Sequence, residues 1–155
     1  MVPDTSPFRA AEADDSPGFL LWKVTALWQQ TLAGVLSGFG ITQTQYAILA
    51  SLRWFEGREW PATQAHLVEH ARLEKMTLSK AIRRLEDDGL VRRAPSPVDA
   101  RAMQVRFTAK GRSVTEAAIV AIEGADDVFF SALSVTDLAR YKSIAAKLVT
   151  ANTAR

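Results

Sequence analysis

Cysteine is absent from the 155 residues of this chain, and no apolar run approaches the roughly 20 residues that a membrane-spanning helix needs. Without cysteine there are no disulfide bonds, thiolate nucleophiles or cysteine metal ligands. The first 17 residues lack the cationic start and the apolar centre of a signal peptide. We therefore expect a cytoplasmic protein without a membrane partner, in which residues 1–17 form a flexible tail.

The net charge of the chain is small, but its positive charge is concentrated in one block. The formal net charge is +2, yet residues 72–112 hold eleven Lys and Arg against five Asp and Glu, a local charge of +6. The rest of the chain is therefore acidic, at −4. A basic block in an otherwise acidic chain is typical of a protein that binds a polyanion, most simply nucleic acid.

Helical periodicity covers most of the sequence and predicts a single mainly α (α+β) domain over residues 18–155. Helices are expected over about 19–38, 42–55, 63–71 and 74–88, and again after Thr108 and Ser134. Thr42 with Gln45 has the spacing of a capping box, and Thr63 is a predicted cap. Gly89 ends the fourth helix, and residues 90–94 and 103–107 are predicted strands of a hairpin.

The helix predicted over 74–88 has one apolar side and one cationic side. Its buried stripe is formed by Leu78, Ala81, Ile82 and Leu85. With the short helix before it, this segment has the outline of a helix-turn-helix, whose second helix fits the major groove of DNA. Lys80 and Arg83 lie opposite the stripe, so we predict that they read base edges. Thr77, Ser79 and Arg84 are predicted to make phosphate or secondary contacts.

The hairpin after this helix reads as a wing. Arg92 and Arg93 lie on its first strand, and Arg101 follows the proline-rich turn between the strands. Cations in these places can add contacts with DNA, because the tip of a wing can enter the neighbouring minor groove. A short cationic helix followed directly by a strand with two arginines is therefore typical of a DNA-binding winged helix.

The recognition helix "MTLSKAIRRLEDDGLVRR", the wing "SPVDARAMQVRFTAKG" and the order of the helices around them resemble the MarR (multiple-antibiotic-resistance regulator) family over about residues 19–150. The resemblance implies a homodimer with a winged helix-turn-helix lobe over 41–111 and a dimerisation body from the helices of 18–40 and 112–155. It also implies that Lys80 contacts bases, and that Arg101 enters the minor groove with Asp99 as its orienting partner. Ala100 and Ala102 stand where some members have further arginines, which implies a weaker wing.

A small-molecule site is a further expectation from the same resemblance, since such proteins often bind small aromatic acids. The side chains that could line a cleft beside the DNA-binding lobe are Trp22, Thr25, Gln29, Tyr46 and Arg53. The four tryptophans, at 22, 28, 54 and 60, are individually more typical of core or subunit contacts. His66 and His70 lack a third ligand, so we expect no metal and no cofactor, and read them as solvated or capping residues.

Three functions compete for this pattern. The first is a sequence-specific regulator of transcription, a homodimeric repressor that reads a pseudo-palindromic operator and releases it when an aromatic effector binds. An enzyme is disfavoured because no nucleophile with its base, no phosphate loop and no acidic cluster is visible. The third is a winged-helix module that binds a protein instead of DNA. Such a module would usually have lost the outward cations, which this sequence keeps at 80, 83, 84 and 101.

Overall fold

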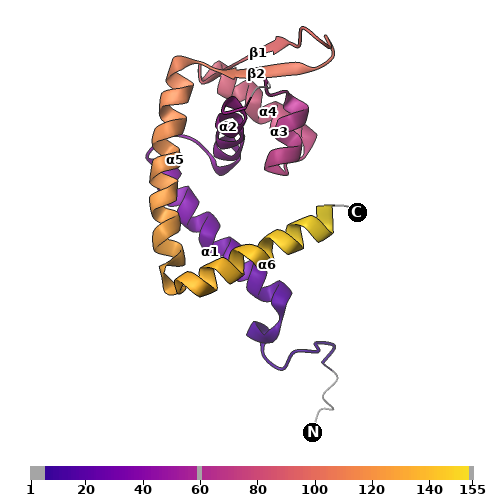
Figure 1. The fold of residues 1–155 in the computed structure, drawn as a ribbon, viewed down its shortest axis with the longest axis vertical. Coiled ribbons are helices and arrows are strands. Elements are labelled where there is room, and N and C mark those ends of the chain that lie inside the picture. The colour runs from indigo at the N-terminus through magenta and orange to yellow at the C-terminus, as the bar shows by residue number, and fades with distance from the viewer. Residues whose placement is uncertain (1–5, 59–60, 154–155) are drawn as a thin grey trace.

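The computed structural model describes residues 6–58 and 61–153, and its order of elements is that expected from the sequence (Figure 1). Residues 1–5 of the predicted tail, Trp60 and the last two residues lie outside the described part. The elements are η1 (Ala13–Asp15), α1 (Pro17–Ser37), α2 (Gln43–Glu56), α3 (Gln64–Ala71), α4 (Lys75–Asp87), β1 (Val91–Pro95), β2 (Met103–Phe107), α5 (Ala109–Phe129), η2 (Phe130–Ala132) and α6 (Val135–Thr153). Among the described residues, no helix combines the length and apolar character required to cross a bilayer.

The elements α2, α3, α4, β1 and β2 form a winged lobe (Figure 1). Its buried core continues into Leu36 of α1 and into Ala118 and Ile122 of α5. Ile48 of α2, Leu67 of α3 and Ile82 of α4 are completely buried in this core. The α4 stripe predicted from the sequence is confirmed, since Leu78 and Leu85 are also fully buried and Ala81 is half-buried. Burial of this stripe turns the other side of α4 toward solvent.

Local hydrogen bonds fix where the helices of the winged lobe begin. The predicted capping box is present: the Gln45 N–H donates to the Thr42 hydroxyl at 3.1 Å, and the Thr42 N–H donates to Gln45 Oε1 at 2.9 Å. Thr63 caps α3 as predicted, with the ring of His66 as its return partner. Each box satisfies N–H groups that the first turn of a helix would otherwise leave unpaired. His66 is therefore a capping residue.

The wing is an antiparallel hairpin in which Arg92 faces Arg106 across the strands. The residues just before α3 lie beside β2: the Val105 N–H donates to the Ala62 carbonyl at 2.9 Å, and Thr63 forms an isolated β-bridge with Gln104. This pairing was not predicted, because two residues before a helix carry no alternation of their own. It ties the base of the wing to the start of α3.

The junction between β1 and α5 is unusually close. Gly111 in the first turn of α5 lies against the backbone of Leu90, and a Cβ built on it would stand 1.8 Å from the Leu90 carbonyl oxygen. The Thr108 hydroxyl donates to the Gly89 carbonyl at 2.6 Å and accepts from the Gly111 N–H. The direction in which α5 leaves the winged lobe is thus set by a contact that only glycine permits.

The helices α1, α5 and α6 form a second region, here called the helical body. Trp28 of α1 packs edge-on against Phe129 at 5.3 Å between ring centroids, and Phe130 lies 5.1 Å from the Tyr141 ring of α6. Yet α6 contains no buried residue and leaves the end of α5 at a sharp angle (Figure 1). A packed three-helix body is therefore not complete within one chain.

The described part of the N-terminal segment is not wholly irregular. Residues 13–15 form the 3-10 helix η1, and Asp14 pairs with Lys23 on α1. Ser16 caps α1, whose first residue is Pro17, one residue before the predicted domain boundary. A proline at the first position of a helix costs no hydrogen bond, because that N–H has no partner inside the helix.

Candidate nucleic-acid interface

The solvent side of α4 carries the two residues predicted to read bases. Lys80 and Arg83 are both exposed, and neither has a hydrogen bond or an ion pair within residues 6–58 and 61–153. Because Leu78, Ile82 and Leu85 hold the opposite side of the helix in the core, these cations are presented outward on a rigid element. Unpaired cations on a helix of this kind are available to a polyanion.

The neighbouring side chains Thr77 and Arg84 form single hydrogen bonds with residues three or four positions away in the sequence. The Thr77 hydroxyl donates to Glu74 Oε2 at 3.0 Å, and Arg84 Nε donates to Asp88 Oδ2 at 3.2 Å one turn further on. Ser79 is half-buried beside them. An exposed ion pair is worth about 0 to 1 kcal/mol, so a DNA phosphate can replace Asp88 as the partner of Arg84 at little cost.

The two arginines of β1 point to opposite faces of the hairpin. Arg92 is exposed, whereas the guanidinium of Arg93 turns inward and donates to Glu86 Oε1 at 3.2 and 3.1 Å. The Arg93 N–H also donates to Glu86 Oε2 at 2.8 Å, and these side-chain and backbone hydrogen bonds lower the pKa of Glu86. Arg93 therefore braces the wing against α4, and its predicted role as a DNA contact has less support than that of Arg92.

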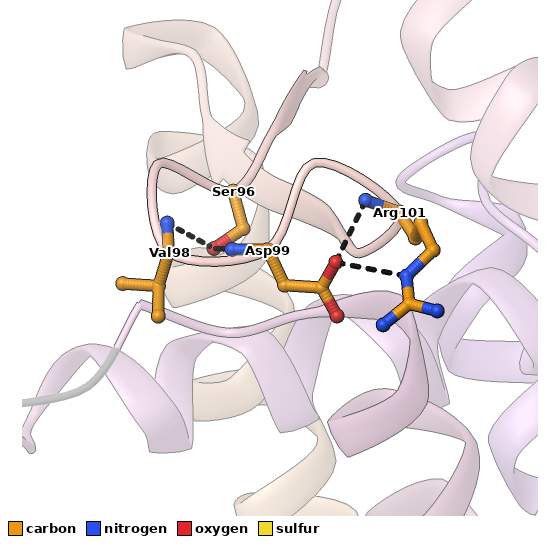
Figure 2. Close-up of polar contacts among 4 residues, drawn as sticks. All are labelled: Ser96, Val98, Asp99 and Arg101. Carbon is orange, nitrogen blue, oxygen red and sulfur yellow. Dashed lines mark hydrogen bonds and ion pairs between the residues drawn. The ribbon is translucent and has the colours of Figure 1, made fainter.

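The tip of the wing is organised around two short polar side chains (Figure 2). The Ser96 hydroxyl accepts from the N–H groups of Val98 and Asp99 at 3.3 and 3.4 Å. Asp99 Oδ1 then accepts from both the N–H and the Nε of Arg101, at 3.0 and 3.2 Å (Figure 2). The Arg101 side chain remains 93% exposed. Asp99 thus orients Arg101 while leaving it in solvent.

The five residues predicted to line one effector cleft do not share a cavity in the single chain. Trp22, Thr25 and Gln29 line a groove of about 380 Å³ along α1. Arg53 lines a different hollow at the end of α2 and pairs with Glu116 of α5. The single effector cleft therefore stays a prediction, and within one chain four of its residues are divided between these two hollows.

Tyr46, the fifth of these residues, packs half-buried against the core. Burial raises the pKa of the Tyr46 hydroxyl, and the carboxylates of Glu123 and Asp126 on α5 raise it further. The hydroxyl therefore stays protonated at neutral pH and can donate a hydrogen bond. It does not line the groove that holds Trp22.

Sequence reasoning gave no role to Arg58, Arg106 or Arg112. Arg106 lies directly opposite Arg92 on the hairpin, and both are exposed. Arg58 and Arg112 gather near Arg106 around the hollow that also contains Arg53. The position of Arg106 on an alternating strand could have indicated its exposure, but no local pattern indicates that these arginines meet.

Comparisons with known proteins agree with the winged-helix fold of this chain. The model of the "ArnR1-like, winged-helix domain" family matches residues 38–125. The uncharacterized HTH-type transcriptional regulator YdcH of Bacillus subtilis (strain 168) is 32% identical over 117 residues, 76% of this chain and 80% of that protein. The HTH-type transcriptional repressor Rv2887 of Mycobacterium tuberculosis is 29% identical over 137 residues, 88% of this chain and 96% of the repressor.

Solved structures extend the likeness to three dimensions. The crystal structure of the MarR family protein Rv2887 in complex with p-aminosalicylic acid has a TM-score of 0.65 and 26% identity, and the match covers 86% of this chain and 98% of that one. A mutant of MarR from Escherichia coli complexed with operator DNA has a TM-score of 0.77 over 85% of this chain and 92% of that one. At 23% identity, this second likeness shows the fold.

Proposed function

Since the chain belongs to the MarR family of winged-helix transcriptional regulators, we propose that it is a homodimeric repressor of a pseudo-palindromic operator in double-stranded DNA. One observation carries the DNA-binding part. Lys80 and Arg83 stand unpaired on the outer side of α4, within the described residues, and Arg101 extends from the wing tip held by Asp99. The helix is placed to read the major groove and the wing to reach the adjacent minor groove.

The residues of the interface divide into readers and positioners. Lys80 and Arg83 read base edges, because their side chains project from the centre of the exposed face of α4. Thr77, Ser79, Arg84 and Arg92 hold phosphates, which fixes the register of the protein on the duplex without selecting a sequence. Arg93 acts through Glu86 by keeping the wing in place beside α4.

The homodimer follows from apolar surface that one chain leaves uncovered. On α6, Ile144 and Leu148 are 61% and 55% exposed, and on α1 Leu21 is 64% exposed. Exposed apolar patches on helices with few contacts of their own mark protein interfaces. Covering them with a second copy on a two-fold axis would place two α4 helices about one helical turn of DNA apart.

Release of DNA by a small aromatic acid is proposed from two features. The relative Rv2887 has been crystallised with p-aminosalicylic acid, and the groove beside Trp22, Thr25 and Gln29 offers an aromatic and polar wall on α1. Heating the protein with a panel of phenols and aromatic carboxylates tests this proposal, because a ligand that binds the folded state raises the unfolding midpoint. If no compound does so, the effector part of the proposal fails.

The proposed function needs no catalytic step and no cofactor, and we place the protein in the cytoplasm because that is where a bacterial-type repressor meets its operator. Binding to random duplexes at two salt concentrations, followed by sequencing of the retained DNA, tests the proposal directly. We expect a two-fold motif with half-sites roughly 10 base pairs apart, and binding that weakens steeply with salt. Retention without an enriched motif, or no retention, would favour the protein-interaction module.

A further inference from the structure

A hollow of about 500 Å³ lies away from the α4 face, between the end of α2, the strand β2 and the first turns of α5. The buried side chains of Leu52, Ala62 and Val105 lie beneath it, and most of the surface that it exposes is polar. Its walls are cationic, with guanidinium groups contributed by Arg53, Arg58, Arg106 and Arg112. Arginines brought together from four different segments form a concentration of charge that the sequence does not reveal.

Two of the four arginines are neutralised by acids across the α2–α5 contact. Arg53 of α2 donates through Nε to Glu116 Oε1 of α5 at 3.0 Å. Arg112 of α5 donates through Nη2 to Glu56 Oε1 of α2 at 2.5 Å. In the first ion pair α2 supplies the arginine and α5 the acid, and in the second pair these roles are reversed. The two pairs therefore fix α2 and α5 to each other along one side of the hollow.

The other two arginines have no acidic partner among the described residues. The Arg58 guanidinium lies over the ring of Trp54, 3.0 Å from its centroid, and donates to the Trp54 carbonyl at 2.6 Å. Arg106 Nη2 donates to the neutral side-chain oxygen of Gln104 at 3.3 Å. Arg58 is thus oriented by an aromatic face and Arg106 by an amide, and both keep their charge available to a ligand.

The charges of these named groups set the chemistry of the ligand. Four guanidinium groups against the carboxylates of Glu56 and Glu116 leave two positive charges. A guanidinium fork matches the two oxygens of a carboxylate or a phosphate. A phosphate monoester carries a charge of about −1.5 to −2 at pH 7, and a dicarboxylate carries two charges.

We propose that this hollow is a binding site for a small organic dianion, a phosphate monoester or a dicarboxylate, held mainly by Arg58 and Arg106. The ligand lies at the joint between the winged lobe and α5. The site is separate from the groove beside Trp22 and from the α4 face, and its occupation does not depend on DNA.

Calorimetric titration of the full chain without DNA tests the site, with phenyl phosphate and phthalate as dianionic probes and benzoate as a monoanion. We expect at least one dianion to bind about tenfold more tightly than benzoate, and the tighter of the two names the ligand class. Arg58→Ala and Arg106→Ala should each weaken that binding about tenfold or more. Arg106→Lys, which keeps the charge but loses the fork, should fall between Arg106→Ala and the unaltered protein.

Arg92→Ala is the matched control, because Arg92 stands opposite Arg106 on the hairpin and outside the lining of the hollow. It removes the same charge from the same sheet, so dianion binding should change by less than about twofold if the site is specific. Thermal melting of each variant shows that it is folded. Equal losses in Arg92→Ala and Arg106→Ala would reduce the effect to general attraction and overturn the proposal. So would the absence of binding heat with both dianions.

Discussion

The winged lobe and the helical body of this chain bury apolar surface in different ways. In the winged lobe, α2, α3 and α4 each contribute completely buried side chains to one core, among them Ile48, Leu67 and Ile82. In the helical body, α6 contributes none, although Ile144 and Leu148 give it an apolar face. The core of the lobe is thus covered within one chain, with Leu36 of α1 and Ile122 of α5 as part of it, whereas the apolar face of α6 needs a second chain to cover it.

Charge separates the two regions as well. The winged lobe carries most of the basic block and leaves cations of α4 and the wing in solvent, while the acids Glu123 and Asp126 face Tyr46 from α5. A lobe whose apolar side chains are buried, and whose cations Lys80 and Arg83 are exposed without acidic partners among the described residues, fits a surface for a polyanion. A helical body that leaves the apolar face of α6 exposed to solvent fits a protein interface. The same chain thus presents two surfaces for two kinds of partner.

The largest expected effect comes from breaking the joint between the two regions. In Gly111→Ala, the new Cβ meets the Leu90 carbonyl at 1.8 Å, so we expect a loss of at least about 3 kcal/mol in the free energy of unfolding. Gly124→Ala on the same helix is the control, because nothing lies within 4 Å of its Cβ. It should be neutral or stabilise by up to about 1 kcal/mol. Urea denaturation measures both; similar values would mean that the joint is not tight.

Charging the exposed face of α6 should break the helical body and spare the lobe. Ile144→Asp is expected to weaken the dimer about tenfold to a hundredfold, because each copy then places a carboxylate in the apolar interface. Sedimentation at several protein concentrations measures the association. Lys142→Ala on the same helix is the control and should leave the dimer unchanged. A dimer of undiminished strength in Ile144→Asp would show that α6 is not part of the interface.

On the winged lobe, the role of each cation can be separated by comparing cognate with random DNA. Lys80→Ala should cost about 1 to 3 kcal/mol on the operator and relax specificity there, because a base contact is lost. Arg92→Ala should weaken all sequences nearly equally, as expected for a phosphate contact. Fluorescence anisotropy with both kinds of duplex measures the two losses. If both variants lower cognate and random binding alike, Lys80 does not read bases.

The wing tip should have a smaller and more selective effect. Arg101→Ala is expected to cost about 1 kcal/mol on operators with an A·T-rich flank and less on G·C-rich flanks, because a narrow minor groove attracts an inserted arginine. Asp99→Ala, which removes the oxygen that orients Arg101, should produce a weaker version of the same pattern. Anisotropy on matched operators that differ only in the flank measures this. Losses that ignore the flank would place Arg101 outside the minor groove.

The smallest effect concerns pH and the brace between α4 and the wing. Hydrogen bonds from Arg93 lower the pKa of Glu86, so the pair stabilises the fold above the unfolded pKa of about 4.3 and loses this contribution as the pH falls through the lower folded value. Glu86→Gln should therefore be less stable than the unaltered protein at pH 7, by under about 1 kcal/mol for a partly exposed pair. The difference should shrink as the pH falls below the unfolded pKa, and it should disappear once Glu86 is protonated in the folded state as well. A difference independent of pH in urea denaturation would exclude the ion pair as its cause.

The local features of the winged lobe could be predicted from the sequence because each depends on residues close together in the chain. The capping box of Thr42 and Gln45, the buried stripe of α4, the turn at Gly89 and the second strand of the hairpin are confirmed. Each follows from a spacing of a few residues, over which the geometry of the backbone is fixed. The hydrogen bonds between Asp99 and Arg101, which the family resemblance implied, also join residues close together in the chain.

The features that could not be predicted join residues far apart. Arg112 meets Glu56 and Arg53 meets Glu116 only because α5 crosses α2 at a particular angle, and the proposed anion site results from that crossing. The same crossing separates Arg53 and Tyr46 from the groove of Trp22, which the predicted effector cleft had combined. Periodicity shows which side of a helix is apolar, but it does not show which neighbour that side meets.

The sequence by itself determined the order of the elements, the cationic side of α4, the wing and its Asp99–Arg101 tip, because caps, stripes and turns depend on contacts within a turn or a hairpin. Only the tertiary structure decided that Arg93 donates hydrogen bonds to Glu86, that α6 leaves its apolar face uncovered and that four arginines surround one hollow. These outcomes depend on the packing of whole helices, which is set by the core as a unit and not by any one segment.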